Sequence, residues 1–183
     1  MIWIGIGLFF GLHIVPSLPN LRHQLIGRLG EKGYRGIYSL LSLLGLVLLS
    51  MGYGRIEYQE LWMTPSWANH LALTVMPLVF VLEVSAELKG HIRKKVKHPM
   101  IIGIFLWSLV HLINNGDIAS LYLFGSFALY SVFSIISSTA RGKLPNYKEP
   151  KIQHDIMAIG FGLALFGGFL WGHEFLFGVT PNF

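Results

Sequence analysis

Six long apolar runs are the feature that most constrains how this chain can fold. A helix needs roughly 17 to 25 mainly apolar residues to cross a bilayer, and six segments reach or approach that length. They lie at about residues 2–16, 36–54, 67–88, 99–115, 118–138 and 156–174. Only 13% of the 183 residues are charged, against about a quarter in an ordinary soluble domain. The sequence therefore predicts an all-α fold, a polytopic membrane bundle of about six transmembrane helices.

The basic residues predict the orientation of that bundle. Thirteen of the 14 Lys and Arg residues fall in three alternate loops, and Arg55 is the exception. Cytoplasmic loops carry the excess of Lys and Arg in membrane proteins, so both termini are expected on the outer side. No repeat or linker interrupts residues 1–183, which are expected to form one domain. The net charge of +5 forms no single basic face, so nucleic acid is not an expected partner and the lipid bilayer is.

Polar residues inside the apolar runs are the candidates for function, because ionisable groups in hydrocarbon are costly. The chain has no cysteine, which excludes thiolate zinc sites and iron–sulfur clusters. Among its eight histidines, His13 lies about one turn from the inner end of the first run. His98 lies at the inner mouth of the fourth run, so the two can share a layer. Arg22, Arg35 and Tyr38 belong to the same inner region.

Two chemistries are open for these residues. Two imidazoles at one depth on different helices suit axial ligation of a haem iron, with His13 and His98 as ligands and Arg22, Arg35 or Tyr38 on the propionates. A second, outer layer contains five polar residues, and it holds enough nitrogen and oxygen ligands for a zinc site. The outer residues are His70, His111, Asn114, Asp117 and His173. The alternative for every histidine is hydrogen bonding between packed helices.

Several polar residues are given a simpler interpretation. The run from Arg93 to Lys97 is interpreted as a topology determinant, and Glu83 is expected to pair with Lys89 or Arg93 at the interface. The inner-loop histidines 23, 91 and 154 are assigned no role. The segment from Asn20 to Gly33 is expected to form an amphipathic helix at the membrane surface. Six glycines within the later runs are expected to let helices approach closely. They are Gly103, Gly125, Gly160, Gly162, Gly167 and Gly168.

Three blocks of sequence resemble the bacterial NnrU family of integral membrane proteins. The first extends from Gly11 through the motif HIVPSLPNLR to Ser39. The second begins with His98-Pro99-Met100 and ends at Asp117, and the third is the tail from His173 to Pro181. The resemblance covers the chain from its first run to its tail. It implies a multi-pass protein of the bacterial inner membrane, associated with nitrite and nitric oxide metabolism in denitrification.

The chain is also similar to 15-cis-zeta-carotene isomerase over the first and fourth runs. That resemblance implies haem b, with His13 and His98 as ligands, and a hydrophobic polyene as a small-molecule substrate. The chain departs from the isomerase pattern in having no cysteine. The motif from Lys97 to Gly103 resembles that of membrane methyltransferases less closely. The alternatives to a haem protein of nitrogen-oxide metabolism are therefore a haem-dependent isomerase, and, third, a non-catalytic membrane partner or a methyltransferase-like enzyme.

Overall fold

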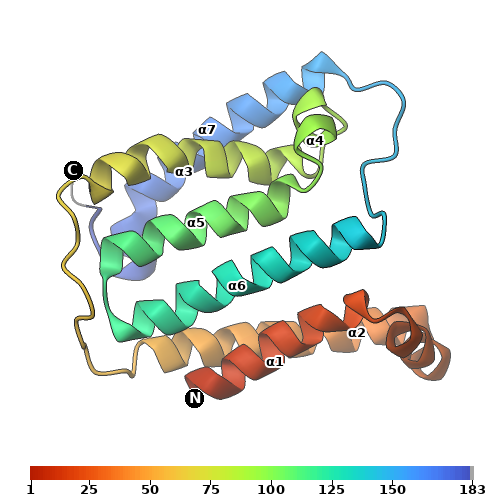
Figure 1. The fold of residues 1–183 in the computed structure, drawn as a ribbon, viewed down its shortest axis with the longest axis horizontal. Helices are drawn as coiled ribbons and strands as arrows, with labels where there is room; N and C mark the ends of the chain where they lie inside the picture. Colours follow the sequence, from red (N-terminus) through yellow and green to blue (C-terminus); the bar gives the residue numbers. More distant parts are fainter. Residues whose placement is uncertain (182–183) are drawn as a thin grey trace. The chain divides into compact units, whose positions relative to one another are not determined.

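The computed structural model describes residues 1–181, and its regular elements are all helices (Figure 1). They are α1 (Ile2–Ile14), η1 (Val15–Ser17), α2 (Pro19–Tyr53), α3 (Ala68–Ser85), α4 (His91–Val96), α5 (Pro99–Asn115), α6 (Ile118–Ala140) and α7 (Ile152–Phe177). The all-α prediction is confirmed. Four helices, α2, α3, α6 and α7, are long and apolar enough to cross a membrane, whereas α1 with η1 and α5 are shorter apolar helices. The exact number of spans and the outward termini stay predictions.

Proline and glycine mark several of the helix ends. Pro19 and Pro99 occupy the first position of α2 and α5, where the missing N–H group costs nothing and the fixed φ suits a helix. Gly116 and Gly178 end α5 and α7 in the left-handed conformation, at φ of 69° and 70°, which is the usual glycine stop. These ends therefore follow from local chemistry. Five of the apolar helices lie within a few residues of the expected runs, whereas α2 also includes the segment before the second run.

α2 is broken by a kink at Gly30, whose φ of 69° and ψ of 162° are not helical. That combination is essentially restricted to glycine. The expected surface helix therefore exists, but it ends before Gly30 instead of at Gly33. Two of its leucines, Leu21 and Leu29, are 39% and 42% exposed, as expected for a face that lies against lipid.

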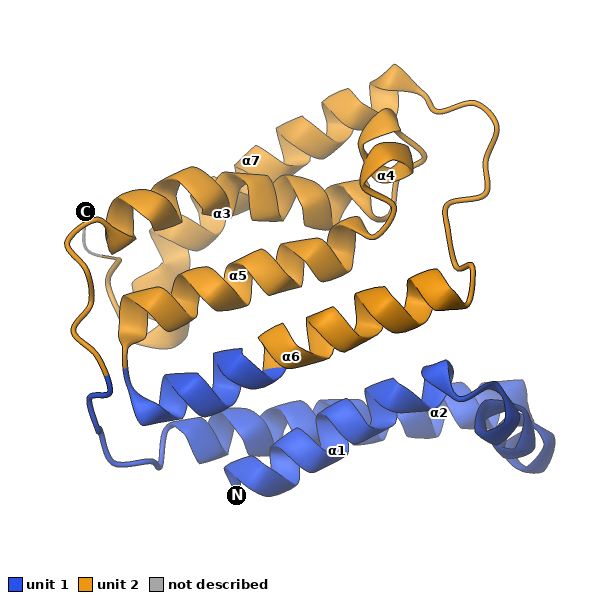
Figure 2. Ribbon diagram, in the orientation of Figure 1, with its two compact units in different colours: residues 1–61, 117–126 blue, residues 62–116, 127–183 orange. Residues whose placement is uncertain are grey.

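The chain divides into two compact units (Figure 2). Unit 1 comprises residues 1–61 and 117–126, and unit 2 comprises residues 62–116 and 127–183. Helix α6 belongs to both, with the boundary between Ser126 and Phe127. Each unit is described separately below, and the single domain expected from the sequence stays a prediction.

Unit 1 is organised by an antiparallel contact between α1 and α2. A Cβ on Gly5 would lie 2.5 Å from the backbone nitrogen of Leu49, and one on Gly45 would lie 2.8 Å from that of Phe9. Such distances mean that the two backbones touch, which glycine permits and which suits helix association in lipid. Leu49 is fully buried in this contact. Close packing at glycines therefore also occurs between α1 and α2, where the sequence analysis did not predict it.

Unit 2 is organised around α3, which packs against α5 and α7. Gly162 of α7 meets the backbone of Val81, where a Cβ would lie 2.7 Å from the Val81 Cα atom, and Gly103 of α5 faces Glu83. By contrast, a Cβ on Gly160 would meet nothing within 4 Å. Glycine packing is thus confirmed at positions 103 and 162 and absent at position 160.

The outer surfaces of the helices are strongly apolar. Trp171 and Phe175 of α7 are 91% and 93% exposed. Small residues occupy the helix contacts instead, and Ser108, Ser120 and Ser131 have no exposed surface. Soluble proteins rarely expose so much contiguous apolar surface, whereas lipid-facing helices pack through small residues. The structure therefore supports a lipid bilayer as the environment of these helices.

Candidate functional site

His13 lies at the end of α1 against an aromatic wall. Its Nδ1 atom is 2.7 Å from the carbonyl oxygen of Phe9, one helical turn earlier. A carbonyl can only accept, so the ring donates from Nδ1, and the tautomer with this arrangement has its lone pair on Nε2. The ring centroid is 4.2 Å from that of Phe9 and 5.6 Å from that of Tyr38 in α2. The sequence-predicted pair of His13 and Tyr38 is therefore brought together within unit 1.

Arg22 joins the same cluster through the kink. Its guanidinium carbon lies 5.9 Å from the ring centroid of Tyr34, a cation–π distance, and the Tyr34 ring lies 5.9 Å from that of Tyr38. Twelve residues of straight helix would separate Arg22 from Tyr34 by about 18 Å. The break at Gly30 is what allows the contact. We call His13, Arg22, Tyr34 and Tyr38 the His13 cluster.

Arg35 does not join the His13 cluster. Its guanidinium pairs with the Glu31 carboxylate at 2.7 Å, one turn away on α2, and both side chains are mostly exposed. Surface pairs of this kind contribute about 0.3–0.5 kcal/mol. Arg35 is therefore placed as a surface residue, which leaves Arg22 and Tyr38 as the sequence-predicted polar partners of His13.

His98, the other predicted haem ligand, belongs to unit 2 and precedes α5 as its N-cap residue. Its Nε2 atom lies 3.1 Å from the hydroxyl oxygen of Thr139 in α6. Burial lowers the pKa of His98 below its ordinary value of 6.5, and the charge of Lys97 lowers it further. The His98 ring is therefore neutral at pH 7, the state that a metal ligand requires.

His98 also lines a basic cavity of about 620 Å³ in unit 2. Four cationic side chains line it, from Lys89, Arg93, Lys97 and Lys143, against one carboxylate, that of Glu87. Lys97 has a positive φ of 68° with a ψ of −49°, and a positive φ is uncommon for a residue other than glycine. We call this space the basic cavity. The residues that line the basic cavity come from two loops, around residues 86–101 and 143–147. The sequence did not indicate that these loops meet.

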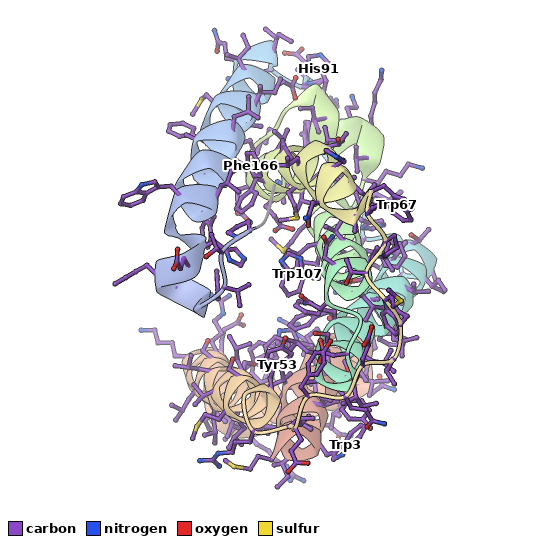
Figure 3. All side chains as sticks on the ribbon, turned by 90° about the vertical axis from the view of Figure 1, so that its left-hand side faces the viewer. Trp3, Tyr53, Trp67, His91, Trp107 and Phe166 are labelled. Carbon is purple, nitrogen blue, oxygen red and sulfur yellow. The ribbon has the colours of Figure 1, made fainter. Side chains whose placement is uncertain are left out.

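The loops around the basic cavity are joined by hydrogen bonds at the start of α4. Asp155, in the first turn of α7, accepts the backbone N–H groups of His91 and Ile92 at 2.9 Å each. The ring of His91, labelled in Figure 3 near the start of α7, contacts the same carboxylate at 2.7 Å. The His154 Nδ1 atom accepts the N–H of Lys89 at 3.2 Å. Two of the three histidines that were assigned no role, His91 and His154, therefore connect these loops.

Further bonds extend this connection along the second loop. The hydroxyl of Tyr147 donates to the Gly90 carbonyl at 2.6 Å, and the Lys151 N–H donates to the Lys89 carbonyl at 3.0 Å. The Lys94 ammonium donates to the Lys148 carbonyl at 2.9 Å. Four further backbone groups, those of Lys89, Gly90, Lys148 and Lys151, are thus bonded near the cavity, and they belong to two loops that are far apart in sequence.

Glu83 is a polar residue whose environment the sequence did not predict. Its Oε1 atom is buried without a hydrogen-bond partner, and it lies opposite Gly103, at 2.5 Å from the position a Cβ would take. Salt bridges among residues 1–181 join Arg35 to Glu31 and His91 to Asp155. The expected pairing of Glu83 with Lys89 or Arg93 is therefore wrong.

The outer layer of predicted residues is engaged in helix packing. His111 donates from Nδ1 to the Trp107 carbonyl at 2.9 Å and stacks on the Trp107 ring. The ring of Trp107, labelled in Figure 3, packs in turn on Phe127 at 5.3 Å between centroids. The Asn114 amide donates to two carbonyls, those of Ala68 and Val110. Each of these contacts ties a helix to itself or to its neighbour.

The remaining outer residues have end-of-helix roles. Asp117 accepts the Ser120 N–H at 2.9 Å and so caps α6, while His173 donates to the Val179 carbonyl at 2.7 Å beyond the end of α7. The side chain of His70 is exposed. No group of three or more His, Asp or Glu residues within positions 1–181 is arranged to hold a metal ion. The zinc alternative therefore lacks the ligand geometry that it needs.

Comparison with known proteins identifies one family. The family described as NnrU protein matches residues 1–181, nearly the whole chain. No curated protein matches the chain, and no solved structure matches it.

Proposed function

The chain belongs to the NnrU family, and from that premise we propose that it is a bacterial inner-membrane protein that binds haem b and serves nitrite and nitric oxide metabolism. His13 and His98 are the residues that would hold the haem iron. Arg22 and Tyr38 are the proposed partners of the propionates. Haem, when bound, would supply one-electron chemistry.

The observation that carries this proposal is the hydrogen bond from His13 Nδ1 to the Phe9 carbonyl. Metal-binding histidines usually donate their second nitrogen to a carbonyl or carboxylate, which fixes the tautomer and the ring orientation. The aromatic rings of Phe9 and Tyr38 beside His13 suit the faces of a porphyrin. Arg22, held over Tyr34, adds a cation that attracts a carboxylate. The residues of the His13 cluster therefore fit the group.

His13 and His98 differ in the hydrogen bonds that coordination of iron would leave in place. The neutral ring of His98 fits a ligand, but its Nε2 atom is bonded to Thr139. Coordination through Nε2 would replace that hydrogen bond. Removing the Thr139 hydroxyl should therefore not weaken haem binding, whereas removing either imidazole should.

An absorption spectrum of the detergent-purified protein tests the proposal. After expression with added haem precursor, we expect a Soret band that His13→Ala and His98→Ala each abolish. His23→Ala and His173→Ala are the matched controls, because they remove a histidine from outside the proposed pair, and both should keep the band. Size-exclusion chromatography verifies that each variant is folded. Absence of a Soret band in the wild-type protein would contradict haem binding, and loss of the band only in His173→Ala would move the site to the outer residues.

A growth experiment tests the metabolic part of the proposal separately. Deleting the gene from a denitrifying host should impair growth on nitrite, and the wild-type gene should restore it. The His13→Ala gene should not restore it. Full restoration by His13→Ala would show that the role in nitrite metabolism does not require haem at this position.

One observation favours a second candidate function, a haem-dependent isomerase that acts on a hydrophobic polyene. Unit 2 contains a cavity of about 490 Å³ whose lining is entirely apolar. Its walls come from α3, α4, α5 and α7, and include Leu82, Leu106 and Leu163. Cavities of this size and character bind apolar ligands. Accumulation of a cis-polyene in the deletion strain, without a defect on nitrite, would favour the isomerase; the opposite pattern would exclude it.

A further inference from the structure

We propose that the basic cavity binds a phosphate group, carried either by the headgroup of an anionic phospholipid or by a soluble phosphate ester. This inference goes beyond the proposed function, since it concerns residues that the haem proposal does not use. The volume of the basic cavity, about 620 Å³, falls in the range of small-molecule sites, about 300–1,000 Å³.

The charge of the lining selects an anion. Lys89, Arg93, Lys97 and Lys143 contribute four positive charges against one negative charge from Glu87. Grouped cations repel one another, so an anion that binds among them relieves an unfavourable interaction. Arg and Lys side chains bind phosphate oxygens through charge-assisted hydrogen bonds, Lys as a point charge and Arg as a fork.

The two loops that line the basic cavity are held in a fixed geometry, which a role in membrane orientation does not require. A topology determinant needs only enough Lys and Arg residues near the ends of the spans, with no fixed geometry. Here the loop that follows α3 is bonded to the loop that follows α6, through the Tyr147 hydroxyl to Gly90 and the Lys151 N–H to Lys89. Tyr147 and Lys89 themselves line the cavity. The cationic groups are thus attached to a fixed framework, which lowers the entropy lost when a ligand binds.

The backbone on the wall of the cavity strengthens this interpretation. Lys97 has a positive φ of 68°, and strained residues of this kind persist where surrounding structure holds them, often at binding sites. The next residues, His98, Pro99, Met100 and Ile101, also line the cavity. Pro99 has no N–H group, but the N–H groups of Met100 and Ile101 in the first turn of α5 lack helical partners, so they add donors beside the four cations.

The position of the cavity relative to apolar surface makes a phospholipid a suitable source. Leu82 lines the apolar cavity and Ala86 lines the basic cavity, and these residues lie one turn apart at the end of α3. Juxtamembrane clusters of basic residues attract anionic lipids, with about 1 kcal/mol per residue near the surface. A soluble ester offers the same phosphate chemistry without acyl chains, and the test separates the two sources.

The test uses two double variants with equal loss of charge. The cavity variant is Lys97→Gln with Lys143→Gln. The control variant is Lys95→Gln with Lys148→Gln, which removes one cation from each of the same two loops without altering the lining. His98 is intact in both, so a haem spectrum that persists in the cavity variant separates this inference from the haem proposal.

Binding is measured as the rise in the thermal unfolding midpoint of the full chain, titrated in detergent with phosphatidylglycerol, phosphatidylcholine or sn-glycerol 3-phosphate. We expect phosphatidylglycerol to raise the midpoint, and the cavity variant to weaken its apparent affinity at least about tenfold, as the loss of two charged contacts implies. The control variant should bind like the wild type. A response to sn-glycerol 3-phosphate as well identifies a soluble ester as the source, and its absence identifies the lipid.

Two results would overturn the inference. In the first, neither anionic probe, phosphatidylglycerol or sn-glycerol 3-phosphate, shifts the midpoint of the wild-type protein, or phosphatidylcholine shifts it as much as phosphatidylglycerol. In the second, both double variants lose the same affinity, which would mean that the response reflects general surface charge instead of the cavity.

Discussion

The carboxylate of Asp155 receives both the backbone N–H and the ring of His91, at 2.9 and 2.7 Å. The two residues belong to different helices of unit 2, α7 and α4. Asp155 is only 6% exposed, and it also accepts the N–H of Ile92. One buried side chain therefore caps α4 and fixes the loop that carries Lys89 and Arg93.

Replacing Asp155 with Ala should lower the free energy of unfolding by about 1–3 kcal/mol, because two backbone N–H groups lose their acceptor. Denaturant unfolding in detergent, followed by circular dichroism, measures the change. Glu149→Ala is the matched control, since it removes the same charge from the preceding exposed loop, and it should change stability by less than about 0.5 kcal/mol. Equal losses in the two variants would contradict a specific role for Asp155.

Gly162→Ala should be destabilising by about 1–3 kcal/mol, since its Cβ would come within 2.7 Å of the Val81 Cα atom in α3. Gly160→Ala, two residues away on the same helix, would meet nothing within 4 Å and should be neutral or stabilising by up to about 1 kcal/mol. Thermal unfolding of the two variants compares them directly. A neutral Gly162→Ala would mean that α3 and α7 do not touch at this point.

Gly30→Ala should disrupt the kink in α2, because a φ of 69° with a ψ of 162° costs about 1–3 kcal/mol for a residue with a Cβ. The cysteine-free chain permits selective spin labels at positions 23 and 37, on either side of the kink. Their separation should increase in Gly30→Ala as the helix straightens. Gly27→Ala, where a Cβ meets nothing within 4 Å, should leave the distance unchanged; an unchanged distance in Gly30→Ala would argue against the kink.

His98 should titrate below 6.5, because burial and then Lys97 lower its pKa. The folded state binds this proton less readily than the unfolded chain does. The free energy of unfolding therefore falls as the pH drops from the unfolded pKa of His98 to its lower folded pKa. NMR of labelled histidine measures the midpoint. Lys97→Gln should raise it partway towards 6.5, whereas Lys95→Gln should affect it less; a midpoint at or above 6.5 in the wild type would contradict the prediction.

Much of the fold is predictable from local sequence. The apolar runs, Pro99 and Gly116 located α5 within residues 99–115, where the structure also has it. The candidate site was only partly predictable. His13 and Tyr38 are 25 positions apart, yet their common depth indicated that they could meet, and they do. Arg35 was an equally suitable candidate for this site, but it pairs with Glu31 instead. A contact one turn away loses less conformational entropy than a contact between helices.

The sequence by itself determined that the chain is helical and apolar enough for a membrane, because hydrophobic length and helix stops are properties of adjacent residues. Only the tertiary structure decided that Asp155 and Tyr147 bind the loop before α5, that Glu83 lies buried opposite Gly103, and that four cations line one cavity. These facts depend on contacts between residues some 20 to 65 positions apart. No local preference specifies such contacts, since they form only when helices pack and the chain between them is ordered.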